Sequence, residues 1–212
     1  MKISEIFRSI EGEGPRQGHL CTFIRTHSCP LRCSYCDSLY AVEGNDFKEM
    51  TIVDIMNEVN RLGGYFCTVT GGEPLIQQDI SLLINELANQ GFLVNIETSG
   101  AVDYIPYLSR DDVFVTADWK CKSSGMSDKM IKDQIHYLRN KDVLKFVVGS
   151  EEDLFEMMDL IQETSAQIFV SPVFGKIKPK EIVDFMQAHE LFDVRVQVQL
   201  HKIIWDPMAR GV

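Results

Sequence analysis

The sequence lacks any hydrophobic run long enough to cross a membrane, and no apolar segment of useful length follows its N-terminus. It also lacks a basic cluster: 31 acidic residues against 21 lysines and arginines give a net charge of −10. Because a negative chain is repelled by a phosphate backbone, nucleic acid is not expected as its main partner. We therefore expect a cytoplasmic protein with no membrane or nucleic-acid partner.

Low-complexity tracts, long repeats and linkers are also absent, and 212 residues suffice for one domain with a real core. Six cysteines are too few for a disulfide scaffold in a chain of this length, and without a secretory signal their thiols should stay reduced. Cys21 and Cys67 lie in apolar strand-like runs and are expected in the core. The pattern assigns no role to Cys121.

The other three cysteines, Cys29, Cys33 and Cys36, follow the spacing Cys-x3-Cys-x2-Cys. Iron–sulfur clusters are normally held by thiolates that can converge in this way. A four-iron cluster on three ligands keeps one iron open, which indicates a site that binds a small molecule and reacts. The alternatives are ordinary buried cysteines or a structural zinc site, which would need a fourth ligand such as His27. We favour the cluster.

Apolar β-branched runs alternate with amphipathic helical patterns along the chain. Strands are predicted at 20–28, 65–70, 92–97, 113–117, 143–148, 168–170 and 194–200. The last of these would place His201 on the face of Arg195, Gln197 and Gln199. Helices are predicted from a Thr51–Asp54 capping box, over 79–90, from a cap at 150–153, and from near 179 to 191.

Alternating strands and helices imply parallel strands joined by right-handed crossovers. About six such units fit, fewer than the eight of a closed barrel, so the predicted fold is a single α/β domain over 1–212, a partial, open β/α barrel. Ligands gather beyond the carboxyl ends of such strands. Polar and glycine-rich segments stand there: the cysteine loop, 71–74, 97–100, 118–120 and 171–174.

These segments resemble the radical S-adenosylmethionine superfamily, whose signature is the cysteine triplet with an aromatic residue, here Tyr35, before the last cysteine. The segment 71–74 is similar to the superfamily's methionine-binding segment. More narrowly, the chain resembles the 7-carboxy-7-deazaguanine synthase family of queuosine biosynthesis, a tRNA modification. The matching segments span the whole chain: 9–14, 36–38, 70–74, 97–100, 123–125 and 199–205.

The resemblance implies a lyase with a [4Fe-4S] cluster on the triplet and S-adenosylmethionine chelated to the open iron. One electron would release a 5′-deoxyadenosyl radical, which takes a hydrogen from carbon 6 of 6-carboxy-5,6,7,8-tetrahydropterin. Ring contraction and loss of ammonia would give 7-carboxy-7-deazaguanine, with no catalytic protein residue beyond the radical. The resemblance also implies Mg²⁺ on Ser38, where threonine is usual in the family, a flavodoxin or ferredoxin as reductant, and a homodimer.

The resemblance also assigns binding residues. The contacts with S-adenosylmethionine would come from Tyr35, Cys36, Asp37, Gly72, Glu73, Asp118, Trp119, Lys120, Ser171, Pro172, Val173 and Phe174. The pterin would be held by Ile10, Glu11, Gly12, Glu13, Arg25, Thr70, His201 and the terminal carboxylate of Val212. Segments 1–18 and 199–212 would therefore close the active site.

Judged from the residues alone, two of these assignments have simpler alternatives. The 10–18 turn is typical of a loop or hairpin with solvated acids. Arg25 could equally meet an anionic substrate or form a structural ion pair. Under the resemblance, Glu11 or Glu13 suits the donor-rich guanidine edge of a pterin, and Arg25 suits the substrate carboxylate.

Two other functions fit parts of the pattern. An activating enzyme for a glycyl-radical protein would share the triplet, but the 10–14 and 199–201 segments disfavour it. A non-catalytic iron–sulfur or zinc module would need a fourth ligand and would leave the strand-end segments without a role.

Overall fold

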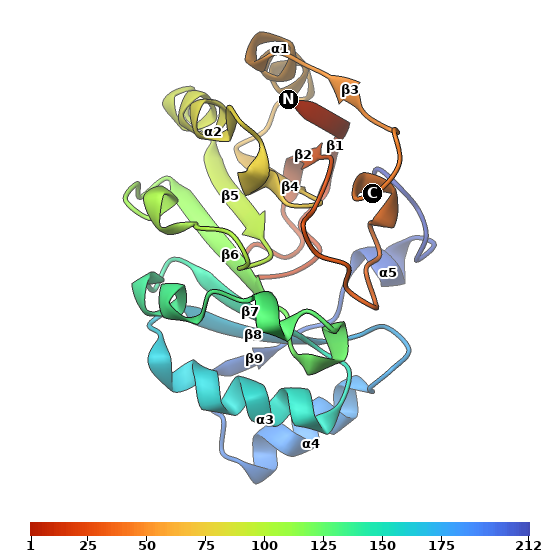
Figure 1. The fold of residues 1–212 in the computed structure, drawn as a ribbon, viewed down its shortest axis with the longest axis vertical. Helices are drawn as coiled ribbons and strands as arrows, with labels where there is room; N and C mark the ends of the chain where they lie inside the picture. The colour runs from red at the N-terminus through yellow and green to blue at the C-terminus, as the bar shows by residue number, and fades with distance from the viewer.

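The computed structural model describes residues 1–212 and contains one nine-stranded sheet in the order β3-β1-β2-β4-β5-β6-β7-β8-β9 (Figure 1). β1 (Lys2–Ile10) runs antiparallel to β2 (Leu20–Thr26) on one side and to β3 (Lys48–Glu49) on the other. From β2 onward all neighbours are parallel. Since β3 and β9 are separate edges, the barrel is open, as predicted.

The parallel strands alternate with helices packed on the outside of the sheet (Figure 1). The remaining strands are β4 (Phe66–Gly71), β5 (Leu93–Thr98), β6 (Val113–Trp119), β7 (Val143–Val148), β8 (Gln167–Pro172) and β9 (Val194–Val196). The helices are α1 (Ile52–Leu62), α2 (Ile80–Asn89), α3 (Glu151–Leu160), α4 (Pro179–Ala188) and α5 (His201–Ile204). Between β5 and β7 the crossovers hold only short 3-10 turns.

Local capping explains where α1 begins. Thr51 Oγ1 accepts from Asp54 N at 3.2 Å, and Asp54 Oδ2 accepts from Thr51 N at 3.1 Å, so the predicted capping box is confirmed. Ser150 is likewise the residue before α3, but its side chain makes no capping bond. The carboxylate of Asp153 accepts from Gly149 N instead, at 2.7 Å.

Two parts of the strand prediction were wrong. β1 was not predicted, because its charged residues interrupt the apolar alternation that marks a buried strand. The predicted strand 194–200 stops at Val196, and His201 begins α5 rather than extending a strand face. Tertiary contacts override the alternating pattern here, since Leu200 N donates to Gly12 O at 3.1 Å.

The core lies between the sheet and the helices. Cys67 and Cys121 belong to the main apolar cluster, and Cys21 is buried with its thiol donating to Thr68 Oγ1 at 3.4 Å. Cys21 and Cys67 are therefore core residues, as expected. All six thiols are free, and none of the helices combines the length and apolar character that a bilayer crossing requires.

Candidate functional site

A cleft of about 560 Å³ opens at the carboxyl ends of the parallel strands. It is lined by the cysteine loop, the turn that follows β1, the ends of β4 to β7 and residues near the C-terminus. Figure 1 shows α5 and the C-terminus beside the segment that follows β2. The first and last segments of the chain thus meet the strand ends at one place.

The cysteine triplet lies in this cleft, with all three thiols free and half-buried. Burial raises the pKa of each thiol, while the ammonium of Lys120 lowers it in all three. The pKa of all three thiols is raised overall, so the ammonium only partly offsets the cost of the thiolate form that iron–sulfur ligation requires. Three free thiols beside a cation in one cleft fit a thiolate-bound metal centre.

His27 does not supply a fourth ligand. The ring is buried, its Nδ1 lies 3.1 Å from Ser4 Oγ, and its Nε2 lies 3.2 Å from Gly44 O. Both nitrogens are therefore occupied, and His27 does not line the cleft. The triplet keeps three protein ligands, which fits a cluster with an open iron.

Spacing also favours a cluster over a single zinc ion. Only Cys121, Asp153 and Glu156 form a group of three whose ligand atoms all lie within 4.8 Å of one another. At least one pair of triplet thiols is therefore more than 4.8 Å apart, beyond the separation of about 3.8 Å that zinc–sulfur bonds of about 2.3 Å impose in a tetrahedral site. A four-iron cluster is larger than a single zinc ion, so the wider spacing favours the cluster.

The end of β4 presses against the backbone that leads into the cysteine loop. Gly72 N donates to Thr26 O at 3.1 Å, and Glu73 N donates to Ser28 O at 2.9 Å. A Cβ on Gly71 would stand 2.2 Å from Thr26 O, and one on Gly72 would stand 2.3 Å from Ser28 O. Glycine is required at both positions because no side chain fits between these backbones.

Four of the expected cofactor residues, Glu73, Trp119, Ser171 and Pro172, do not line the cleft. Glu73 is fully buried and accepts from Ser99 N at 2.7 Å and Ser99 Oγ at 2.6 Å, so it joins the ends of β4 and β5. The indole of Trp119 donates to Glu156 on α3 at 2.9 Å. The side chains of both are thus engaged away from the cleft, whereas the other eight residues of the set line it.

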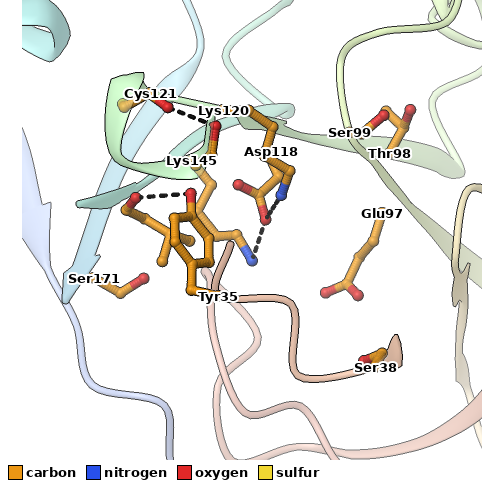
Figure 2. A network of polar contacts seen from close by, with 12 residues as sticks. Tyr35, Ser38, Glu97, Thr98, Ser99, Asp118, Lys120, Cys121, Lys145 and Ser171 are labelled. Atoms are coloured by element: carbon orange, nitrogen blue, oxygen red, sulfur yellow. Dashed lines mark hydrogen bonds and ion pairs between the residues drawn. The ribbon is translucent and has the colours of Figure 1, made fainter. Parts of the chain in front are cut away.

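An ion-pair chain lies among the residues that line the cleft, and Figure 2 shows the part of it formed by Lys120, Asp118 and Lys145. Asp118 Oδ2 lies 3.0 Å from Lys120 Nζ and 3.2 Å from Lys145 Nζ, and Lys145 Nζ lies 3.1 Å from Glu13 Oε2. Burial disfavours charge on Asp118, but Lys120 and Lys145 overcome it and lower the pKa of that carboxyl. Asp118 Oδ1 is buried without a partner, so it offers an acceptor to a polar ligand.

Lys145 is a site residue that the sequence motifs do not indicate. Burial opposes its charge, but Asp118 and Glu13 outweigh burial and raise the pKa of Lys145 well above its usual value. It is the one charged residue in β7, whose six residues are all buried. A lone lysine in an apolar strand was the signal that could have revealed it, because such a charge is buried only with partners.

All eight residues expected to hold the pterin line the cleft. Glu11 is buried and accepts a hydrogen bond from Thr68, and Arg16 lies 4.0 Å from its carboxylate. The segment does join the antiparallel strands β1 and β2 as the alternative of a hairpin predicted, but its two acids are not solvated. Residues 198–200 contact this turn: Gln17 Nε2 donates to Val198 O at 3.0 Å, and Leu200 N donates to Gly12 O at 3.1 Å.

Arg25 makes the structural ion pair that was one of its two expected roles, at a place where the other role is also open to it. Its Nε donates to Glu5 Oε1 at 2.7 Å, and the hydroxyl of Tyr40 donates to the same oxygen at 2.6 Å. Arg25 and Tyr40 also line the cleft. The ion pair with Glu5 thus holds a guanidinium at the cleft wall, where it can meet an anionic ligand.

Two contacts tie the C-terminal segment to this site. Lys202 Nζ lies 2.8 Å from Asp37 Oδ2; partial desolvation would raise the pKa of Asp37, but the charge of Lys202 lowers it to about 2. Ser38, the expected magnesium ligand, lines the cleft and donates to Asp37 Oδ1 at 3.0 Å. A Cβ on Gly12 would stand 2.5 Å from His201 Nδ1, so His201 packs directly on the turn.

Glu11 makes stability depend on pH. Burial, reinforced by the charge of Glu97, raises the pKa of Glu11 from 4.5 to about 7. When the pKa of a carboxyl is higher in the folded protein than in the unfolded chain, the free energy of unfolding decreases as the pH rises between those two pKa values. Glu11→Gln has no carboxyl to ionise at this position and should not show this decrease. Between pH 4.5 and pH 8 its free energy of unfolding should therefore rise by up to about 3 kcal/mol relative to that of wild type.

Urea unfolding at pH 4.5, 6 and 8 measures this difference. Glu86→Gln, at a half-buried glutamate on α2 outside the cleft, is the matched control. If the free energies of unfolding of wild type and Glu11→Gln change with pH by the same amount over this range, the pKa of Glu11 is not raised.

Comparison with known proteins is consistent with this geometry. The model of the Radical SAM superfamily matches residues 23–187. The chain is 43% identical over 218 residues to the 7-carboxy-7-deazaguanine synthase of Clostridium acetobutylicum, an alignment covering 100% of this chain and 99% of that relative. It is 36% identical to the synthase of Methanospirillum hungatei, with 98% of this chain and 86% of the relative covered.

Two solved structures share the fold. QueE from Escherichia coli superposes with a TM-score of 0.77 at 21% identity, covering 94% of both chains. SuiB of Streptococcus suis bound to S-adenosylmethionine superposes with a TM-score of 0.61 at 12% identity, covering 83% of this chain and 46% of SuiB.

Proposed function

The chain belongs to the 7-carboxy-7-deazaguanine synthase family of the radical S-adenosylmethionine superfamily, and we propose that its cleft converts 6-carboxy-5,6,7,8-tetrahydropterin to 7-carboxy-7-deazaguanine with loss of ammonia. One observation carries the proposal for this cleft: the cysteine triplet and all eight residues assigned to the pterin line a single cavity of about 560 Å³. These residues come from both ends of the chain, so the cavity depends on the whole sequence.

The cysteine side of the cleft would hold the cofactors. Cys29, Cys33 and Cys36 are the cluster ligands, and the unpartnered Oδ1 of Asp118 is an acceptor for a donor group of S-adenosylmethionine. When bound and reduced by one electron, the cluster and S-adenosylmethionine supply the radical that removes a hydrogen from the substrate. The further cofactor contacts proposed at the cleft wall are Tyr35, Asp37, Gly72, Lys120, Val173 and Phe174.

Another group of lining residues, gathered around the turn after β1, would hold the pterin. Glu11 and Glu13 face its guanidine edge as acceptors, and Arg25 faces its carboxylate. Because the pKa of Glu11 is raised to about 7, the donor-rich edge would bind best when that carboxyl is ionised, so affinity should increase with pH through this region. His201 and Val212 would cover the bound substrate and exclude water.

Further features of the reaction are part of the same proposal. The Ser38 hydroxyl beside Asp37 would be one oxygen ligand of a Mg²⁺ ion. A flavodoxin or ferredoxin would deliver the electron, and the chain would act in the cytoplasm as a homodimer. The six free thiols are consistent with a reducing compartment.

Anaerobic reconstitution tests the function. Purified protein with iron, sulfide, reductant, S-adenosylmethionine and carboxytetrahydropterin should form 7-carboxy-7-deazaguanine and 5′-deoxyadenosine, both detected by mass spectrometry. Cys33→Ala is the matched control without an intact triplet. No deoxyadenosine in the presence of substrate would contradict radical chemistry, and deoxyadenosine without the ring-contracted product would favour an activating enzyme for a glycyl-radical protein.

A further inference from the structure

Outside the cleft, Cys121, Asp153 and Glu156 form a group whose ligand atoms lie within 4.8 Å of one another. The carboxylate of Asp153 is fully buried and already bonded: Oδ1 accepts from Ser123 N at 3.0 Å, and Oδ2 accepts from Gly149 N at 2.7 Å. Asp153 therefore connects α3 to the end of β7 and to the loop that follows β6.

Glu156, one turn further along α3, holds the same loop at two more points. Its Oε1 accepts from Trp119 Nε1 at 2.9 Å, and its Oε2 accepts from Lys122 N at 3.1 Å. All four oxygens of the two carboxylates thus accept hydrogen bonds from the protein. Three of the four donors belong to residues 119–123. Carboxylates satisfied in this way form a clamp on the loop rather than a metal site.

The clamped loop in turn holds the cysteine loop. Ser34, between the second and third cysteines of the triplet, donates from N to Ser124 O at 2.9 Å and from Oγ to Ser123 O at 2.7 Å. Ser124 is buried and donates from Oγ to Cys121 O at 2.6 Å, which orients this part of the loop. A continuous set of bonds therefore runs from α3 to the middle of the triplet.

We propose that Asp153 and Glu156 are positioning residues for the iron–sulfur cluster, which act through residues 119–124 and Ser34 on the geometry of the three thiols. This inference rests on the cluster assignment of the proposed function but not on the identity of the substrate. Outer partners that orient metal ligands typically change metal affinity 10-fold to 100-fold when they are removed. A comparable effect is expected here without any contact between α3 and the cluster.

Ser34→Ala and Glu156→Gln are the variants that test this set of bonds. Ser34 is exposed and Glu156 is half-buried, so both proteins should fold, whereas Asp153 is fully buried. In Glu156→Gln the side-chain amide nitrogen cannot accept a hydrogen bond. One of the two N–H donors of the loop therefore loses its acceptor. Ser34→Thr keeps the hydroxyl and should restore the behaviour of wild type.

Matched controls exist away from the cleft. Ser81→Ala removes another exposed serine hydroxyl, which bonds Tyr107 at 2.9 Å, and Glu58→Gln alters another glutamate that makes two hydrogen bonds, both with Arg61. Ser81 lies on α2 and Glu58 on α1, and neither lines the cleft.

Two measurements avoid any dependence on turnover. Hydrogen exchange of the metal-free protein should be faster over residues 29–38 in Ser34→Ala and Glu156→Gln than in wild type and the controls. The reconstituted variants should lose iron to a chelator at least about 10-fold faster, followed by the absorbance of the cluster.

Unchanged exchange and iron release in Glu156→Gln would overturn the proposal, even if that variant formed less product. Equal changes in Glu58→Gln would also overturn it, because the effect would then follow general stability. Iron release is measured without substrate, so a wild-type protein that holds its cluster but forms no 7-carboxy-7-deazaguanine would contradict the proposed function alone.

Discussion

Replacing Gly72 with alanine is expected to lower turnover by about 100-fold or more, because misplacing reacting groups by about 1 Å has an effect of that size. The added Cβ would stand 2.3 Å from Ser28 O, 2.6 Å from Ser28 C and 3.1 Å from Ala41 O. All three are backbone atoms, so no change of rotamer relieves the collision. The end of β4 must move away from Ser28, which directly precedes the first cysteine of the triplet.

The comparison with Gly91→Ala separates this collision from ordinary backbone strain. Gly91 has a φ of +91° and nothing within 4 Å of its Cβ position, so alanine there is strained but meets no neighbour. That variant should lose about 1 to 2 kcal/mol of stability and keep its turnover. Calorimetry of S-adenosylmethionine binding to the reconstituted proteins should show weak binding for Gly72→Ala alone, and near-normal binding by that variant would contradict the expected shift of β4.

The position of the site could be predicted because parallel strands place their carboxyl ends at one edge of a sheet. Once β4, β5 and β6 are recognised as parallel strands, it follows that the polar segments after them lie close together. The cysteine spacing then indicated which of these segments surrounds a metal centre. These inferences use contacts that are local in sequence or regular in the fold.

The environment of the 10–18 turn could not be predicted in the same way. Its glycines and acids are typical of an exposed loop, and contacts with the other end of the chain contribute to the partial burial of Gly14 and Glu13. Gly14 N donates to Gln197 Oε1 at 2.7 Å, and Gln197 Nε2 donates to Glu13 Oε1 at 3.2 Å. Pairings between residues more than 180 positions apart leave no periodic pattern, and the same contacts end β9 earlier than its alternating sequence predicts.

Replacement of Lys145 with methionine should lower the free energy of unfolding by about 3 kcal/mol or more, the usual result of removing one partner from a buried ion pair. Lys145 Nζ lies 3.1 Å from Glu13 and 3.2 Å from Asp118, and only 9% of its side chain is exposed. Asp118 would keep Lys120 as a partner at 3.0 Å, whereas Glu13 would lose its nearest cation. Urea unfolding of the metal-free protein measures the loss.

A second substitution should recover much of this stability but not the activity. Glu13→Gln in the Lys145→Met background removes the unpaired charge, and Ser171 Oγ and Gln197 Nε2 still lie 3.1 Å and 3.2 Å from the Oε1 position for hydrogen bonding. The double variant should therefore be more stable than Lys145→Met alone.

Turnover of the double variant should remain low, because the substrate turn has lost the anion proposed to face the guanidine edge of the pterin. A double variant no more stable than Lys145→Met would mean that the unpaired carboxylate is not the cause of the instability. Recovery of both stability and turnover would mean that the ion pair between Lys145 and Glu13 serves the fold alone. If stability recovers in the double variant while turnover stays low, the ion pair both stabilises the fold and holds a binding group in place.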